Sequence, residues 1–133
     1  MPHLVIEFSS NLEAHLSVKS LINKLHEVTA HIDDFPAAGL KTRGISRPYY
    51  VIADGHPDNC FVHVTLKIGH GRSSEVKARA GTLIFDELVD FLKPISARCP
   101  ISISFELQEL DEKLSYKAGN IREYIAKRRR ATT

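Results

Sequence analysis

The stretch CFVHVTLKIGHGRSSE, residues 60–75, combines the pattern of a strand, a glycine-flanked turn and the start of a helix. In its first nine residues, one face carries Cys60, Val62, Val64, Leu66 and Ile68, as in a strand with that face in the core. Apolar residues then recur at helical spacing: Val76, Ala80, Leu83, Ile84, Leu88 and Phe91. We therefore expect a strand and an amphipathic helix that ends at Pro94, with Gly81 marking close helix–sheet packing.

The first half of the chain has the same order of patterns. Residues 3–8 alternate like a half-buried strand, and apolar residues recur at helical spacing from Ser17 to Ile32, with Ser17 available as the N-cap. The following segment is rich in proline and glycine and has room for two short strands, near 40–46 and 49–53.

Residues 101–108 alternate again, and the tail from Asn120 predicts a short terminal helix. The expected fold class is α+β, with two β-α-β halves and their helices on one face of a mixed sheet. We expect one domain over residues 1–133, with a basic tail at about 127–133. The other face of such a sheet is covered most simply by further subunits, so the chain should oligomerise.

The composition excludes several classes of protein. A chain of 133 residues with 43% hydrophobic and 26% charged residues suits one globular domain. No apolar run approaches a membrane span and the N-terminus lacks a secretory pattern, so we expect a cytoplasmic protein. Cys60 and Cys99 are expected to be reduced structural thiols. The net charge of +2 and a basic run, Lys127 to Arg130, without interleaved aromatic residues do not predict a nucleic-acid partner.

Pro2 directly precedes the first strand pattern and is the candidate catalytic residue. Removal of Met1 before a small residue would leave Pro2 with a free secondary amine, held in a fixed direction by its ring. Burial and neighbouring cations favour the neutral form of an amine, and a neutral amine can act as a general base. The alternative is that Pro2 merely occupies the second position.

The histidines and glycines give weaker signals. His56, His63 and His70 recur every seven residues, but this period reverses faces along a strand, so we expect no metal site. His63 should be a hydrogen-bonded residue of the sheet. The segment GHGRSS does not fit the GxGxxG pattern, so no dinucleotide is expected.

Four stretches carry a resemblance to a known family: PHLVIEFSSN (2–11), FPAAGLKTR (35–43), ADGHPDNCFVHVTLKIGHGRSSE (53–75) and ISISFELQEL (101–110). Together they resemble the 5-carboxymethyl-2-hydroxymuconate isomerases of the tautomerase superfamily. The resemblance implies a homotrimer without metal or organic cofactor, and proton transfer in an unsaturated polycarboxylate during bacterial homoprotocatechuate catabolism. It also implies an N-terminal proline as the base.

The family's functional residues fall on particular positions of this chain. The proline falls on Pro2, and the arginine of the Gly-x-Gly-Arg-Ser segment falls on Arg72, at a predicted helix start that itself favours an anion. A second family arginine falls on Lys41, with Arg43 two residues later on the same strand face. Lysine keeps the charge but lacks the planar fork that binds a carboxylate through two hydrogen bonds.

Two alternatives remain open. The lysine at position 41 suggests a related tautomerase that acts on another keto–enol acid. A non-catalytic oligomeric binding protein with the same fold is the alternative outside the enzymes. Without the resemblance, Arg72 would be interpreted as a solvated loop residue. His3, beside Pro2, has two equal interpretations: it tunes or orients the proline, or it is an ordinary strand residue.

Overall fold

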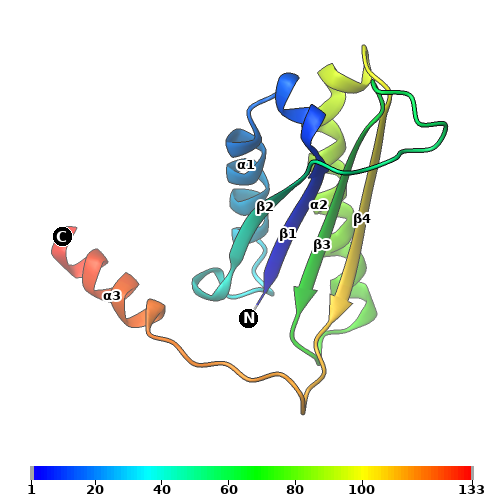
Figure 1. The fold of residues 1–133 in the computed structure, drawn as a ribbon. Helices are drawn as coiled ribbons and strands as arrows, with labels where there is room; N and C mark the ends of the chain where they lie inside the picture. The colour runs from blue at the N-terminus through cyan, green and yellow to red at the C-terminus, as the bar shows by residue number, and fades with distance from the viewer. Residues whose placement is uncertain (1, 133) are drawn as a thin grey trace.

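A four-stranded mixed sheet forms the centre of the fold (Figure 1). The computed structural model describes residues 2–132. The strands are β1 (His3–Ser9), β2 (Lys41–Arg47), β3 (Cys60–Ile68) and β4 (Ile101–Glu109), and they lie in the order β2-β1-β3-β4. β1 runs parallel to β2 and β3 runs parallel to β4, whereas β1 and β3 pair antiparallel at the centre.

Two β-α-β halves, β1-α1-β2 and β3-α2-β4, make up this arrangement and confirm the predicted fold class. The helices are α1 (Val18–Ala30) and α2 (Ser74–Ser96). Each begins at a serine cap, since Ser17 Oγ accepts from Ser20 N–H at 3.2 Å and Ser73 Oγ accepts from Val76 N–H at 3.2 Å. An approximate two-fold axis between β1 and β3 therefore relates the halves.

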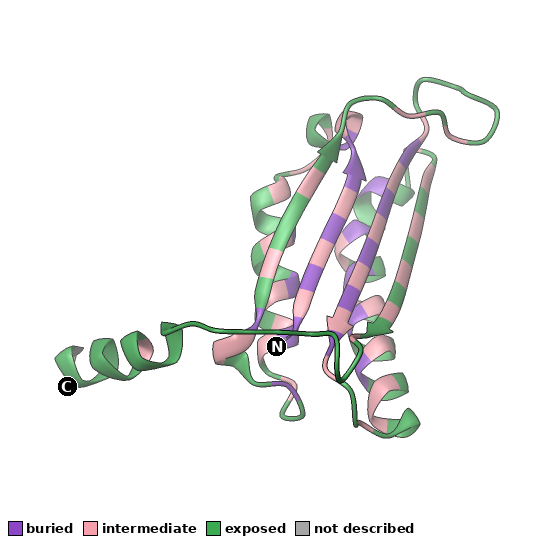
Figure 2. Ribbon diagram, turned by 60° about the horizontal axis from the view of Figure 1, so that its bottom comes forward, coloured by how far each residue is buried: buried purple, intermediate pink, exposed green. Residues whose placement is uncertain are grey.

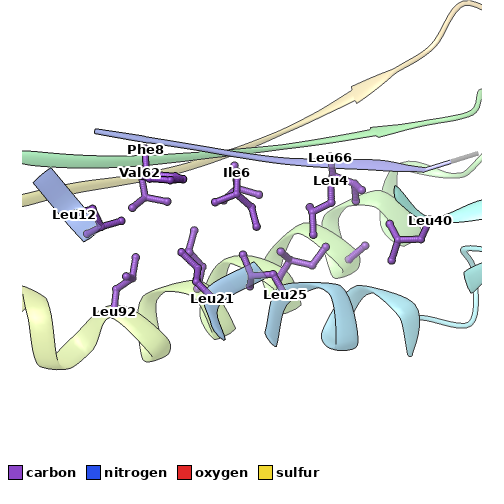
Figure 3. Packing of buried hydrophobic residues seen from close by; sticks show 14 of the residues in the cluster. Leu4, Ile6, Phe8, Leu12, Leu21, Leu25, Leu40, Val62, Leu66 and Leu92 are labelled. Carbon is purple, nitrogen blue, oxygen red and sulfur yellow. The ribbon is translucent and has the colours of Figure 1, made fainter. Parts of the chain in front are cut away.

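The core lies between one face of the sheet and the two helices, as Figure 3 shows. Alternate residues of the central strands point into it, and α1 and α2 cover them with their apolar stripes. Fully buried members include Leu4, Ile6, Val62, Leu66, Leu21, Leu25, Leu88 and Leu92. Burying such a side chain contributes about 1.5–3 kcal/mol. The opposite face carries half-buried and exposed residues and no helix (Figure 2).

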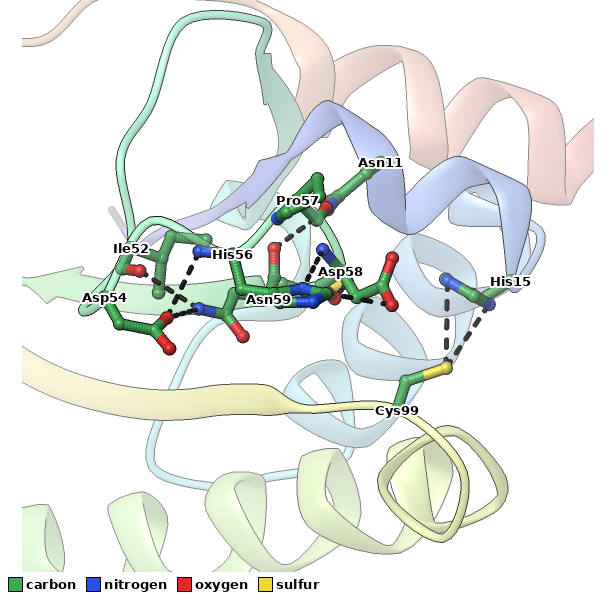
Figure 4. Close-up of polar contacts among 10 residues, drawn as sticks. Asn11, His15, Ile52, Asp54, His56, Pro57, Asp58, Asn59 and Cys99 are labelled. Carbon is green, nitrogen blue, oxygen red and sulfur yellow. Dashed lines mark hydrogen bonds and ion pairs between the residues drawn. The ribbon is translucent and has the colours of Figure 1, made fainter.

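The predicted strand at 49–53 is wrong, because residues 48–59 form a loop (Figure 4). Asn59 Nδ2 donates to Ile52 O at 3.0 Å and to Asp54 Oδ1 at 2.8 Å. Asn11 Nδ2 donates to Asn59 O at 2.8 Å, which joins the loop to the short helical segment that follows β1. Side-chain hydrogen bonds thus replace strand pairing here, and Gly55 with a φ of 83° makes the turn.

The predicted end of the second helix at Pro94 is also wrong, since α2 continues to Ser96. Proline removes one backbone hydrogen bond from a helix, but this loss falls in the last turn. Leu92 and Ile95 on either side of it are buried in the core. Their packing holds the final residues in helical conformation. The prediction for Gly81 is confirmed, because a Cβ there would lie 3.3 Å from the Phe105 ring of β4.

The chain beyond β4 leaves the body of the subunit as a C-terminal arm, residues 110–132. The arm consists of an exposed segment followed by α3 (Ile121–Thr132), which confirms the predicted terminal helix. Figures 1 and 2 show the segment crossing the end of the sheet where β1 begins, from β4 toward β2. There α3 contacts the short 3₁₀ helix η2 (Ala37–Gly39); a second one, η1 (Ser10–Ala14), follows β1. Over residues 2–132, no helix combines the length and apolar character needed to cross a membrane.

Candidate active site

Pro2 is buried at the start of the central strand β1. Its carbonyl oxygen accepts a hydrogen bond from the Lys41 N–H at 3.1 Å, so β2 begins beside it. The next residue, His3, pairs in register with Lys41 on one side and with Lys67 on the other. At the start of β1, the paired residues on both neighbouring strands are therefore cationic.

Four basic side chains share the helix-free face around the start of β1. They are His3, Lys41, Arg43 and Lys67. Arg43 Nη1 lies 3.1 Å from His3 Nδ1, and a guanidinium can only donate, so this contact assigns the proton of neutral His3 to Nε2. Lys41 Nζ donates to Gly39 O at 2.9 Å. Lys41 and Arg43 occupy alternate positions of β2 and share one face, as the sequence predicts.

The charge of this cluster affects His3 directly. Partial burial lowers the pKa of His3 below its usual value, and the positive charges of Arg43 and Lys41 lower it further. The neutral form of His3 is therefore favoured at this end of the sheet.

We expect His3 to titrate below 6.5, the ordinary value for histidine, in a nuclear magnetic resonance titration of its ring protons. Arg43→Gln removes the charge in contact with His3 and should raise the pKa of His3. In the unmodified protein, the unfolded chain binds the His3 proton more readily than the folded chain does. The free energy of unfolding should therefore rise with pH between the folded pKa of His3 and 6.5.

Arg47→Gln is the matched control for this titration. Arg47 lies on the same strand, but its Nε is paired with Glu7 Oε2 at 2.6 Å. We expect the pKa of His3 to be unchanged in this variant. A pKa at or above 6.5 in the unmodified protein would contradict the expected effect of the cluster.

Arg72 lies in the turn between β3 and α2, at the same end of the sheet as Pro2. Its side chain is half-buried: Nε donates to Asp34 O at 2.9 Å and Nη1 to Gly69 O at 3.4 Å. The guanidinium carbon lies 5.0 Å from the centre of the Phe35 ring. Arg72 is therefore not a freely solvated loop residue, and its remaining N–H groups can still donate to an anion.

The structure brings Pro2, Lys41 and Arg43 together, with Arg72 at the same end of the subunit but with partners of its own. Within the described residues, no hydrogen bond joins Arg72 to the other three. Sequence reasoning missed Lys67 and Phe35. The alternation of β3 places Lys67 on the polar face, but only the strand register places it beside His3. The contact between Phe35 and Arg72 has no sequence signal.

The other histidines have separate partners. His63 contacts Ser104 Oγ at 2.6 Å and Glu106 Oε1 at 3.0 Å, as expected of a hydrogen-bonded residue of the sheet. The hydrogen bond from His63 also holds the pKa of Glu106 below its usual range. His56 lies in the loop before β3 and His70 lies near Glu109. Among residues 2–132, no group of three or more histidine, cysteine or acidic residues is arranged to hold a metal ion.

Comparisons with known proteins show which family the chain belongs to. Residues 2–125 match the family model for 5-carboxymethyl-2-hydroxymuconate isomerase. The chain belongs to that isomerase family. The 5-carboxymethyl-2-hydroxymuconate Delta-isomerase of Escherichia coli is 33% identical over 121 residues, covering 91% of this chain and 96% of the relative. These matches confirm the resemblance found in the sequence.

Solved structures agree with this membership of the 5-carboxymethyl-2-hydroxymuconate isomerase family. A member from Deinococcus radiodurans R1 is 35% identical, with a TM-score of 0.84 and 93% of each chain covered. A fused 4-OT wild-type symmetric trimer is 18% identical, with a TM-score of 0.61 over 89% of this chain and 92% of that one. The second likeness shows the shared fold alone. The last residues of α3, beyond Ile125, lie outside the family match.

Proposed function

We propose that this isomerase converts 5-carboxymethyl-2-hydroxymuconate to its oxo isomer, with Pro2 as the general base. The observation that carries the proposal is the buried position of Pro2 at a strand end whose in-register neighbours are cationic. An amine freed there by removal of Met1 is desolvated and lies beside positive charge. Both effects favour its neutral form near pH 7.

The charge of the substrate supports the same assignment. A muconate with an added carboxymethyl group carries three carboxylates, and the site offers cations to match. Arg72 and either Lys41 or Arg43 would bind carboxylates and stabilise the electron-rich dienolate intermediate. Family membership favours this enzyme over the non-catalytic binding protein.

The proposed reaction needs one base and no net change in protons. Neutral Pro2 takes a proton from the substrate and becomes a secondary ammonium, while the electron pair delocalises into the dienolate. The ammonium then returns the proton to a different carbon of the conjugated system, which restores the neutral amine. Binding fixes both carbons within reach of the same nitrogen. The chain itself supplies every group in this scheme, so it calls for no cofactor.

We also propose a homotrimer. On the helix-free face of the sheet, the residues of the central strands are half-buried and no helix covers them. Further subunits would cover this face. The fused 4-OT of the same fold is a symmetric trimer. A role in homoprotocatechuate catabolism remains an expectation from the resemblance, and a cytoplasmic location remains an expectation from the sequence pattern.

One observation favours a second candidate, a related tautomerase acting on another keto–enol acid. Lys41 stands where the resemblance places an arginine, and its Nζ already donates to Gly39 O. A single ammonium binds a carboxylate less specifically than a guanidinium fork does. Faster turnover of a smaller keto acid than of the muconate would support this candidate.

The test is an ultraviolet absorbance assay with 5-carboxymethyl-2-hydroxymuconate, using protein whose N-terminus has been verified by intact mass. We expect rapid turnover by the form without Met1 and none by a form that retains Met1, whose Pro2 nitrogen is an amide. The matched comparison uses equal concentrations of the two forms. Absence of turnover by the Met-free form would overturn the proposed substrate.

A further inference from the structure

The C-terminal arm reaches the candidate site by a defined course. The Leu110 N–H donates to Ile68 O at 2.8 Å, which fixes the start of the arm at the end of β3. Asp111 Oδ1 accepts from the Lys113 and Leu114 N–H groups at 2.8 and 3.0 Å and turns the chain. The arm then crosses the end of the sheet toward η2 (Figure 2).

A cavity of about 700 Å³ lies where the arm meets η2. Its apolar wall includes Pro36, Ala38, Leu40 and Ile121. Three cationic residues, Lys41, Lys117 and Arg122, also line it, and none of its lining residues is acidic. Within the described part of the chain, no carboxylate pairs with any of the three. An apolar surface with several cations that no carboxylate neutralises suits an unsaturated polycarboxylate.

The cavity adjoins the proposed base through Lys41. The backbone N–H of Lys41 donates to Pro2 O, and Lys41 is also one of the residues that line the cavity. An anion held there lies beside the strand end where β1 begins. One residue thus connects the arm's cavity to the proposed site of proton transfer.

We propose that Arg122, at the start of α3, binds a substrate carboxylate across this cavity from Lys41 and acts as a specificity-determining residue. This inference rests on the proposed function and extends it to the arm. Arg122 offers the planar fork that Lys41 lacks, and such a fork binds a carboxylate through two parallel hydrogen bonds. Lys117 adds a further positive charge to the same wall. The chain thereby selects substrates with several carboxylates.

The experiment compares Arg122→Gln with Arg128→Gln. Arg128 lies on the same helix, does not line the cavity, and is 5.7 Å from the centre of the Tyr124 ring. We expect Arg122→Gln to raise KM for the muconate about tenfold, with kcat within about twofold, because a charge-assisted hydrogen bond is lost in ground and transition states alike. Arg122→Lys should recover part of the loss, and Arg128→Gln should match the unmodified protein.

A second measurement separates failure of this inference from failure of the proposed function. Titration calorimetry at about 0.15 M salt measures the Kd of propane-1,2,3-tricarboxylate, a non-reacting probe. We expect Arg122→Gln to weaken this binding about tenfold. Absence of muconate turnover would refute the proposed function, but the calorimetric measurement would still test the role of Arg122. Equal KM and Kd in the Arg122 and Arg128 variants, or no binding of the probe by the unmodified protein, would overturn the inference.

Discussion

Replacing Pro2 with alanine should lower kcat for isomerisation by about a hundredfold. Removal of Met1 before alanine still leaves an amine at the same place, but it is primary and no longer fixed by a ring. The variant therefore tests the secondary amine itself, while the backbone carbonyl that accepts from Lys41 is kept. Steady-state rates on protein checked by intact mass give the result.

Pro100→Ala is the matched control for this change. Pro100 directly precedes β4, and its carbonyl oxygen accepts from the Cys60 N–H at 3.0 Å, as that of Pro2 accepts from Lys41. Its nitrogen is an internal amide, so we expect kcat to remain near that of the unmodified protein. Equal rates for the unmodified protein and Pro2→Ala would exclude Pro2 as the base. The acidic limb of the pH profile of kcat/KM should also shift in Pro2→Ala.

Replacing Arg72 with alanine should lower kcat/KM by about a hundredfold, because a carboxylate in the site would lose its charged partner. The substitution also removes the hydrogen bonds to Asp34 O and Gly69 O and the contact with Phe35. Some loss of stability is therefore expected even if Arg72 binds no substrate. Activity and thermal unfolding should be measured on the same samples.

Phe35→Leu separates the two roles of Arg72. This variant keeps the guanidinium and its hydrogen bonds but removes the aromatic ring beneath it. We expect it to lower the unfolding temperature while kcat/KM changes far less than in Arg72→Ala. Arg72→Lys, which retains the charge, should recover part of the activity. If Phe35→Leu lowers kcat/KM as much as Arg72→Ala does, Arg72 acts by supporting the structure.

Local patterns predicted the strands and helices of the core, because burial of one face imposes a period of two or 3.6 residues. The loop of residues 48–59 was mispredicted because Asn59 and Asp54 form hydrogen bonds that compete with strand pairing. The last turn of α2 was mispredicted because the packing of Ile95 outweighs the backbone bond lost at Pro94. The first error arose where side-chain hydrogen bonds within the loop compete with strand pairing, and the second where packing in the core overrides local preference.

The candidate site was predictable only in part. Alternation on one strand placed Lys41 and Arg43 on the same face, but the position of Lys67 depends on strand register. The contact of Arg72 with Asp34 joins residues 38 positions apart, and no local pattern encodes it. The cavity at Arg122 likewise depends on where the arm crosses the sheet. Contacts between residues far apart in the sequence can be identified only in the three-dimensional structure.

The two-fold relation between the halves has a consequence for stoichiometry. The second half has a corresponding corner where Asn59 precedes β3, and the helix-free face of the neighbouring strand β4 carries Ser102 and Ser104 instead of cations. The nitrogen of Asn59 lies within the chain and is an amide, so this corner has neither a free amine nor its cations. A chain that joins two such halves end to end keeps one free N-terminus. Under the proposed mechanism, each subunit would therefore supply one equivalent of base, although its architecture contains two related corners.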